Sequence, residues 1–246
     1  MNASTLPPVL ALWSPPRSMS TAFFRMMAQR GDFRMHHEPF SDLAARQPYV
    51  VDGTPLTTPE QVFWTFVESS AGTPVFFKDT TEYPHVRLFD ELPFVERVTH
   101  TFIIREPRRA IESHYAMNPG VTLAEVGFEH LYQIFERVRT ETGRAPAVID
   151  ADVLIERPVE TVRAYCDTVG IAFDEGALSW SPGERSEWSR TSHWHKDVAD
   201  SSGFRQSSRQ YEVTVDNNAK LAGYYRHHLP FYEQLRAGAL AVPAAG

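Results

Sequence analysis

The chain has 246 residues, of which 42% are hydrophobic and 22% are charged, and its formal net charge is −7. These values are typical of a globular protein with a substantial core, and the negative charge argues against non-specific nucleic-acid binding through a basic face. Cys166 is the only cysteine, so no intrachain disulfide can form. Because the sequence shows neither a signal peptide nor an apolar run of about 20 residues, we expect a single cytoplasmic domain over residues 1–246, with a flexible tail at 238–246.

Short apolar segments alternate with helical patterns along the chain. The apolar segments predict strands at residues 9–13, 33–37, 74–78, 99–104 and 147–149. Apolar residues at helical spacing predict helices at residues 19–29, 59–69, 107–116, 123–142, 158–169 and 217–235. We expect Ser18 to cap the first of these helices. Strands that alternate with helices predict an α/β fold in which helices flank a central, mainly parallel sheet.

Three cationic side chains stand at the ends of predicted strands. Arg17 comes after the first strand, Lys78 ends the third, and Arg105 follows the fourth. In open α/β sheets, ligands bind beyond the carboxyl ends of the strands. We therefore expect the three cations to meet at one edge of the sheet and to bind a polyanionic ligand.

The segment Ser14-Pro-Pro-Arg-Ser-Met-Ser-Thr21 connects the first strand to the first helix. This placement points the first N–H groups of the helix, and the positive end of its dipole, at a bound anion. Arg17 and three hydroxyl side chains add donors that suit phosphate oxygens, the hydroxyls being those of Ser18, Ser20 and Thr21. The segment is not a Walker A loop, because no lysine follows a glycine in it. A capped helix with a surface arginine is the simpler alternative.

A second basic stretch runs from Phe102 to Tyr115. In it, Arg105 leaves a predicted strand, and Ser113 lies about two turns into the next predicted helix. The two side chains converge on one phosphate if that helix runs back along the edge of the sheet. Solvated arginines and a surface serine are the alternative interpretation.

Together the two stretches resemble the sulfotransferase superfamily. Its members carry a 5′-phosphosulfate loop of the type P-[KR]-[ST]-G-[ST]-T at the start of the first helix, which Pro16 to Thr21 match except at Met19. They also carry an arginine at a strand end and a serine eight positions later, as at Arg105 and Ser113. The resemblance implies a fold like that of P-loop nucleotide-binding proteins. It also implies 3′-phosphoadenosine 5′-phosphosulfate (PAPS) as co-substrate and adenosine 3′,5′-bisphosphate (PAP) as product.

The resemblance also implies which residues bind the co-substrate. They are Arg17, Ser18, Met19, Ser20, Thr21, Arg105 and Ser113. Met19 replaces the usual glycine, so we expect it to lie already in the helical turn, with its side chain turned into the core. Arg17 replaces the lysine of the cytosolic branch. Because arginine keeps its charge, we expect Arg17 to stabilise negative charge without donating a proton.

Three residues are implied to take part in catalysis. Glu38 stands where many carbohydrate and bacterial sulfotransferases have an acidic general base, and Lys78 stands where the family often has an active-site lysine or histidine. Arg17 and Lys78 would stabilise the charge on the leaving group. The alternatives for the base are Asp79, His36 and His37. A salt bridge to Arg17, or a solvated loop acid, is the alternative role for Glu38.

The sequence therefore predicts a sulfotransferase that moves a sulfuryl group from PAPS to a hydroxyl or amine of a small-molecule acceptor. We expect in-line transfer with an acidic base and no metal, because sulfuryl carries less charge than a terminal phosphoryl group. A P-loop kinase or nucleotide hydrolase with an atypical phosphate loop is the alternative, and a non-catalytic nucleotide-binding domain is another. We expect neither a nucleic-acid nor a membrane partner. No motif indicates the identity of the acceptor or the oligomeric state.

A C-terminal helical lid is also expected. Residues 188–209 mix aromatic and basic side chains and are the segment that could fold over the nucleotide. Within it, a solvated position is expected for three basic residues, Lys196, Arg205 and Arg209.

Overall fold

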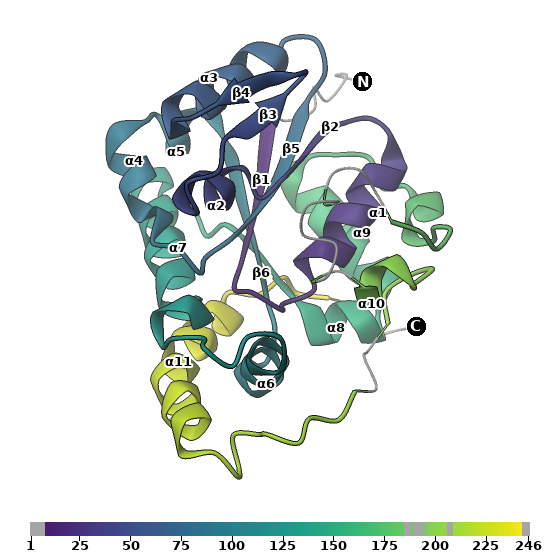
Figure 1. The fold of residues 1–246 in the computed structure, drawn as a ribbon. Helices are drawn as coiled ribbons and strands as arrows, with labels where there is room; N and C mark the ends of the chain where they lie inside the picture. The colour runs from purple at the N-terminus through teal and green to yellow at the C-terminus, as the bar shows by residue number, and fades with distance from the viewer. Residues whose placement is uncertain (1–7, 185–187, 189–193, 195, 206–208, 243–246) are drawn as a thin grey trace.

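A five-stranded sheet forms the centre of the molecule (Figure 1). The computed structural model describes residues 8–184, 188, 194, 196–205 and 209–242. The strands are β1 (Val9–Ser14), β2 (Arg34–His37), β5 (Val75–Thr80), β6 (Thr99–Ile104) and β7 (Ala147–Asp150). They lie in the order β2-β5-β1-β6-β7, and every pairing between neighbours is parallel. The predicted parallel α/β sheet is confirmed.

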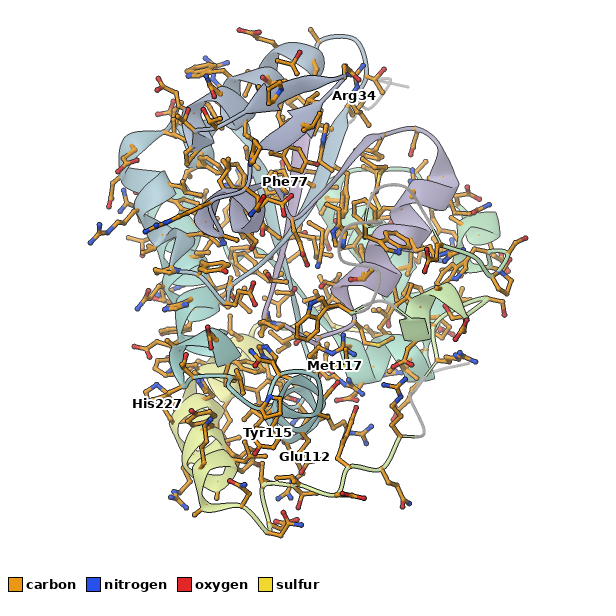
Figure 2. The ribbon with its side chains drawn as sticks, viewed as in Figure 1. Arg34, Phe77, Glu112, Tyr115, Met117 and His227 are labelled. Atoms are coloured by element: carbon orange, nitrogen blue, oxygen red, sulfur yellow. The ribbon has the colours of Figure 1, made fainter. Side chains whose placement is uncertain are left out.

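Two apolar cores lie on opposite faces of this sheet. Trp13 and Phe77 belong to one core, and their chain neighbours Leu12 and Phe76 belong to the other. Successive residues of a strand face opposite sides, so strands with both faces buried have nearly continuous apolar sequences. Phe77 lies inside the molecule, whereas Arg34, on the edge strand β2, reaches the surface (Figure 2).

Helices cover both faces (Figure 1). The core around Trp13 is covered by α2 (Pro39–Ala44), α3 (Pro59–Ser69), α4 (Leu88–Glu91), α5 (Phe94–Arg97), α6 (Pro107–Met117), α7 (Phe128–Thr142) and α11 (Ala219–Ala237). The core around Leu12 is covered by α1 (Ser20–Arg30), α8 (Ala151–Glu156), α9 (Pro158–Val169) and the 3-10 helix η3 (Glu175–Leu178). The shorter elements are α10 (Lys196–Ala199), η1 (His85–Arg87) and η2 (Ala124–Val126). In the described part of the chain, no helix combines the length and apolar character needed to cross a bilayer.

The helix predicted over residues 123–142 was wrong in its first turn. The chain there forms η2, then turns at Gly127, whose φ is 87°, and only then begins α7. Thr81 Oγ1 donates a hydrogen bond to the Gly127 carbonyl at 2.8 Å, and a Cβ at residue 127 would lie 2.9 Å from the Thr81 carbonyl oxygen. This close approach to the end of β5 requires glycine and interrupts the helix.

Several small elements were not predicted, among them a β-hairpin and the helices α2, α4, α5 and α8. The strands β3 (Tyr49–Val51) and β4 (Thr54–Leu56) form an antiparallel hairpin. Asp52 and Gly53 both have positive φ, 49° and 81°, as a type I′ turn requires. The Asp-Gly pair was a signal for this hairpin, but strands of three residues are too short for a clear alternating pattern. Helix α2 was also missed, because a tertiary contact, described below, caps it.

We expect Gly127→Ala to lower the free energy of unfolding more than Gly143→Ala does. Both glycines have positive φ, but a Cβ at residue 143 would meet no atom within 4 Å. Gly143→Ala therefore measures the conformational cost alone, about 1–2 kcal/mol. Gly127→Ala adds the clash with Thr81, for which overpacking costs of about 1–3 kcal/mol are typical. Urea unfolding of both variants checks this, and equal losses would contradict the close approach.

Candidate active site

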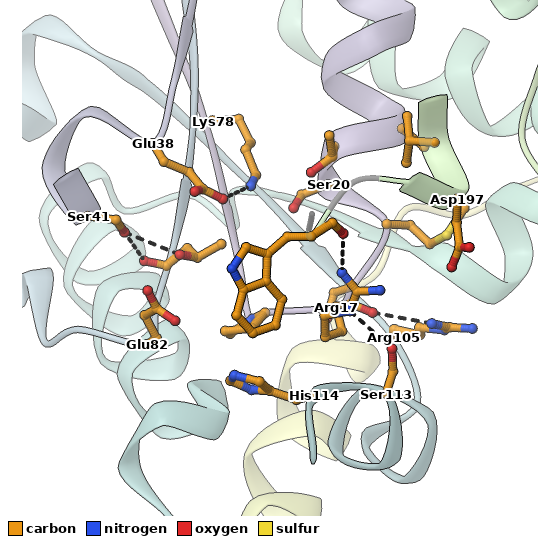
Figure 3. Close-up of a pocket in the computed structure, with 18 of the residues that line it drawn as sticks. Arg17, Ser20, Glu38, Ser41, Lys78, Glu82, Arg105, Ser113, His114 and Asp197 are labelled. Atoms are coloured by element: carbon orange, nitrogen blue, oxygen red, sulfur yellow. Dashed lines mark hydrogen bonds and ion pairs between the residues drawn. The ribbon is translucent and has the colours of Figure 1, made fainter. Parts of the chain in front are cut away.

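A cavity of about 460 Å³ lies at the carboxyl end of the sheet (Figure 3). Its lining includes Arg17, which follows β1, Lys78, which lies in β5, and Arg105, which follows β6. These strands are neighbours, because β1 lies between β5 and β6. The structure thus brings the three predicted cations to one cavity. Lys78 differs slightly from the prediction, since β5 continues past it to Thr80.

The loop between β1 and α1 has an unusual backbone. Arg17 and Met19 both adopt left-handed conformations, with φ of 66° and 68°. Helix α1 begins at Ser20, and Met19 is its N-cap residue without a side-chain cap. The predictions that Ser18 caps the helix and that Met19 lies in the helical turn were therefore wrong. Met19 keeps the conformation that glycine adopts freely, and its side chain packs against the core around Leu12.

Hydroxyl groups and the first turn of α1 line this part of the cavity. Ser14 Oγ donates to Ser20 Oγ at 2.8 Å. Ser18 is buried, and its Oγ has no hydrogen-bond partner among the residues that the structure describes. A buried hydroxyl without a partner is costly unless a ligand supplies one. All residues from Pro16 to Thr21 line the cavity, as expected of a phosphate cradle.

The two predicted phosphate motifs contact each other directly. Arg17 Nε donates to Ser113 Oγ at 3.0 Å, and Arg105 Nη1 donates to the Arg17 carbonyl oxygen at 3.3 Å. Among the described residues, neither arginine forms an ion pair with a carboxylate, and Arg105 Nε has no hydrogen-bond partner. Burial lowers the pKa of both guanidinium groups, and the charge of Arg105 further lowers the pKa of Arg17. Two cations in this setting favour a bound anion.

Glu38 and Lys78 form a second polar pair in the cavity. Lys78, only 1% exposed, donates from Nζ to Glu38 Oε1. The Glu38 N–H donates to the Lys78 carbonyl oxygen at 2.7 Å. Glu38 has a φ of 52° and is the N-cap residue of α2, so the chain turns sharply between β2 and this helix. Lys78 thus pairs with Glu38, in place of the salt bridge to Arg17 that was the alternative from the sequence, and His37 Nδ1 lies 3.9 Å from Glu38 Oε2.

The model of the sulfotransferase domain family matches residues 9–239 of this chain. The chain belongs to the sulfotransferase domain family.

Solved sulfotransferases share the fold. The sulfotransferase domain from the curacin biosynthetic pathway superposes with a TM-score of 0.54 at 14% identity, covering 98% of this chain and 100% of that one. A sulfotransferase from Alicyclobacillus acidocaldarius gives 0.51 at 14% identity, with coverage of 94% and 96%. A mouse sulfotransferase complexed with PAP gives 0.52 at 12% identity, with coverage of 96% and 89%.

Two curated relatives come from Arabidopsis thaliana. Branched-chain-amino-acid aminotransferase-like protein 1 is 31% identical over 244 residues, covering 94% of this chain and 42% of that protein. Branched-chain-amino-acid aminotransferase-like protein 2 is 28% identical over 223 residues, covering 84% and 38%. This sulfotransferase-family chain therefore spans about two fifths of the length of these relatives, whose names describe the whole proteins.

Of the four candidate bases in this sulfotransferase-family chain, Glu38 is the one that lines the cavity. Asp79 is fully buried, and its carboxylate accepts hydrogen bonds from the Phe40 N–H at 2.7 Å and from the Ser41 hydroxyl at 2.5 Å. Through these bonds Asp79 caps α2. Burial raises the pKa of Asp79 to about 7. Asp79 faces away from the cavity because it follows Lys78 in the same strand.

The two histidines are also held in the interior. His36 Nδ1 lies 3.1 Å from the Tyr49 hydroxyl, and its ring stacks on Phe66 with centroids 4.2 Å apart. The ring of His37 packs edge-on against Phe24 at 5.2 Å. Neither histidine lines the cavity.

Glu82 and His114 are among the residues that line the cavity and that the sequence analysis missed. Burial, and after it the charge of Glu38, raises the pKa of Glu82 to about 7. Burial, and after it the charge of Arg17, lowers the pKa of His114 to about 4. The sequence contains only weak indications of these two site residues, because Glu82 lies two residues past β5 and His114 is the chain neighbour of Ser113.

Part of the predicted lid reaches the cavity. Among the described residues of segment 188–209, those lining the cavity are Trp194, Asp197, Val198, Ser201, Gly203, Arg205 and Arg209. Arg205 and Arg209 are exposed, as expected, yet they also line the cavity. The side chain of Lys196 and residues 189–193, 195 and 206–208 lie outside the described part. The C-terminal helix α11 instead packs on α6 and α7.

We expect Asp79→Ala to lower the free energy of unfolding, and not only to change the catalytic rate. The substitution leaves the Phe40 N–H and the Ser41 hydroxyl without their buried acceptor. Each unpaired buried donor costs about 1–3 kcal/mol, so the free energy of unfolding should fall by about 2–6 kcal/mol. The control is Asp90→Ala, which removes a side chain that is 60% exposed and paired with Arg137. Urea unfolding that finds equal losses in the two variants would contradict the capping role of Asp79.

Proposed function

We propose that this chain is a PAPS-dependent sulfotransferase that acts on a hydroxyl or amine of a small-molecule acceptor. The observation that carries the proposal is the meeting of Arg17 and Arg105 beside Ser113 and the first turn of α1. Two like charges that are partly withdrawn from water, with no carboxylate partner among the described residues, are stabilised by a bound polyanion. Membership of the sulfotransferase domain family supports PAPS as this polyanion.

The two ends of the donor can be assigned to different groups. We assign the 5′-phosphosulfate to the loop from Pro16 to Thr21, and the 3′-phosphate to Arg105 with Ser113. Ser18 Oγ and Arg105 Nε, which lack partners among the described residues, are donors that phosphate oxygens would satisfy. A solved sulfotransferase of the same fold contains PAP, the desulfated form of the donor, which supports the assignment.

Glu38 is the proposed general base. In the transfer, the bond from sulfur to the phosphate oxygen of PAPS breaks, and the bond from sulfur to the acceptor oxygen or nitrogen forms. The acceptor proton passes to Glu38. Lys78 orients this carboxylate through its hydrogen bond and places a positive charge beside it. Arg17 stabilises the charge on the departing phosphate, and the loss of one such donor typically costs on the order of 10²–10³ in rate.

Several finer expectations remain proposals. They are the absence of a metal requirement, the cytoplasmic location and the organisation of residues 1–246 as a single domain. The alternative, a P-loop kinase or nucleotide hydrolase, would require a magnesium nucleotide as ligand. It is not favoured, because the phosphate loop has no Walker lysine.

We expect PAP to raise the melting temperature whether or not EDTA is present, and Mg-ATP to raise it less. Arg105→Ala should weaken PAP binding about tenfold or more, because it removes a charge-assisted donor. The matched control is Arg108→Ala, whose side chain pairs with Asp216 at the surface and does not line the cavity. Thermal shift and calorimetric titration check both points. A preference for Mg-ATP would overturn the proposed function, and unchanged affinity in Arg105→Ala would overturn the 3′-phosphate assignment.

We expect Glu38→Gln to lower turnover by about 10²–10⁴-fold, the usual contribution of a general base, while PAP affinity changes little. The amide keeps the shape of the side chain but cannot take the proton. Release of PAP from PAPS in the presence of an acceptor measures turnover, and the PAP affinity of the variant serves as the control for folding. Turnover close to that of the unaltered protein would remove Glu38 from the role of base.

A further inference from the structure

The cavity carries charges of opposite sign at its two ends. Arg17 and Arg105 lie at the donor end, where they contact each other. Glu38 and Glu82 lie on the side away from Arg105 (Figure 3), and Asp42, one turn after Glu38 in α2, also lines the cavity. A donor that carries several negative charges belongs at the first end. The second end is left for the acceptor, and carboxylates dominate it.

Glu82 is the carboxyl group at this end that has no partner among the residues that the structure describes. Lys78 is the cation beside it, and Lys78 already donates to Glu38. Among the described residues, Glu82 has neither a hydrogen-bond partner nor an ion-pair partner. Burial and the charge of Glu38 disfavour its ionised form in spite of Lys78. A cation that entered the cavity would stabilise the ionised carboxylate.

His114 is a second polar side chain without a hydrogen-bond partner among the described residues. It is only 4% exposed and lines the same cavity. Its ring lies edge-on to Trp194, with centroids 5.9 Å apart. Because burial lowers its pKa to about 4, the ring is neutral near pH 7 and one of its nitrogens can accept a hydrogen bond. A neutral acceptor and an indole that line the same cavity as this carboxyl group suit the N–H groups of an organic cation.

We propose that the acceptor carries an ammonium group, and that Glu82 binds this group in the cavity that His114 also lines. The inference rests on the proposed function, because it takes the acceptor to lie opposite the donor. Glu82 then selects the acceptor, and Glu38 takes the proton from the group that receives the sulfuryl. Glu82 is in this way a specificity-determining residue.

The test uses three phenols of similar size that differ in charge. Tyramine carries an ammonium group, 4-propylphenol is neutral, and 3-(4-hydroxyphenyl)propionate carries a carboxylate. Each is titrated by NMR into the protein saturated with PAP, in buffer that contains EDTA. We expect tyramine to bind about tenfold more tightly than 4-propylphenol, and the carboxylate to bind most weakly.

Substitutions of Glu82 then test whether this residue causes the preference for tyramine. Glu82→Gln should bring the affinity for tyramine down to that for 4-propylphenol, and Glu82→Lys should make the carboxylate the best ligand. The control is Glu91→Gln, the same change at an exposed position of α4, which should keep the preference. Equal affinities for the three phenols, binding of none of them, or a tyramine preference that survives Glu82→Gln would overturn the inference.

Failure of the proposed function gives a different result. The titrations are repeated without PAP, and PAP binding is measured separately in each variant. A protein that prefers tyramine through Glu82 but does not bind PAP would retain the ammonium site and refute the proposed function. A protein that binds PAP and ignores the charge of the phenol would retain the proposed function and refute the ammonium site.

Discussion

The contact between Arg17 and Arg105 is the constraint on which the rest of the cavity depends. Strand β1 lies between β5 and β6, so the residues that follow β1 and β6 meet at one point. Ser113 accepts a hydrogen bond from Arg17 and holds the guanidinium in place. The two like charges repel each other, as the lowering of the pKa of Arg17 by Arg105 indicates, and partial burial removes the water that would screen them. Binding of an anion would offset this cost, and this supports the proposal of a polyanionic ligand.

Backbone strain is concentrated around the same cavity. In the described part of the chain, five residues other than glycine have positive φ, and three of them, Arg17, Met19 and Glu38, line the cavity. Such a conformation costs about 1–2 kcal/mol per residue, so packing elsewhere must hold it. At Glu38 the strained turn lets the chain pass from β2 into α2 while the carboxylate reaches Lys78. The strain fixes where the polar groups point.

Local patterns predicted much of the architecture. The strands, their parallel arrangement and most helices follow from apolar periodicity and from proline and glycine stops, which neighbouring residues determine. Predictions failed where a distant residue decides the local conformation. Gly127 ends a helical pattern because it packs on Thr81, and α2 forms because Asp79 caps it from another strand. Met19 stays left-handed because the loop requires it, although glycine would fit there more easily.

The sequence by itself determined the family and the two phosphate motifs, because both motifs are contiguous patterns whose residue types are chemically unusual between a strand and a helix. It also brought Glu38 and Lys78 forward as candidates, since each lies at or next to the end of a strand. Only the tertiary structure decided that Glu38 faces the cavity while Asp79 caps a helix, and that Glu82 and His114 line the same cavity. Which side chains meet in a cavity depends on strand order and helix packing, and these are set by contacts between residues far apart in the chain.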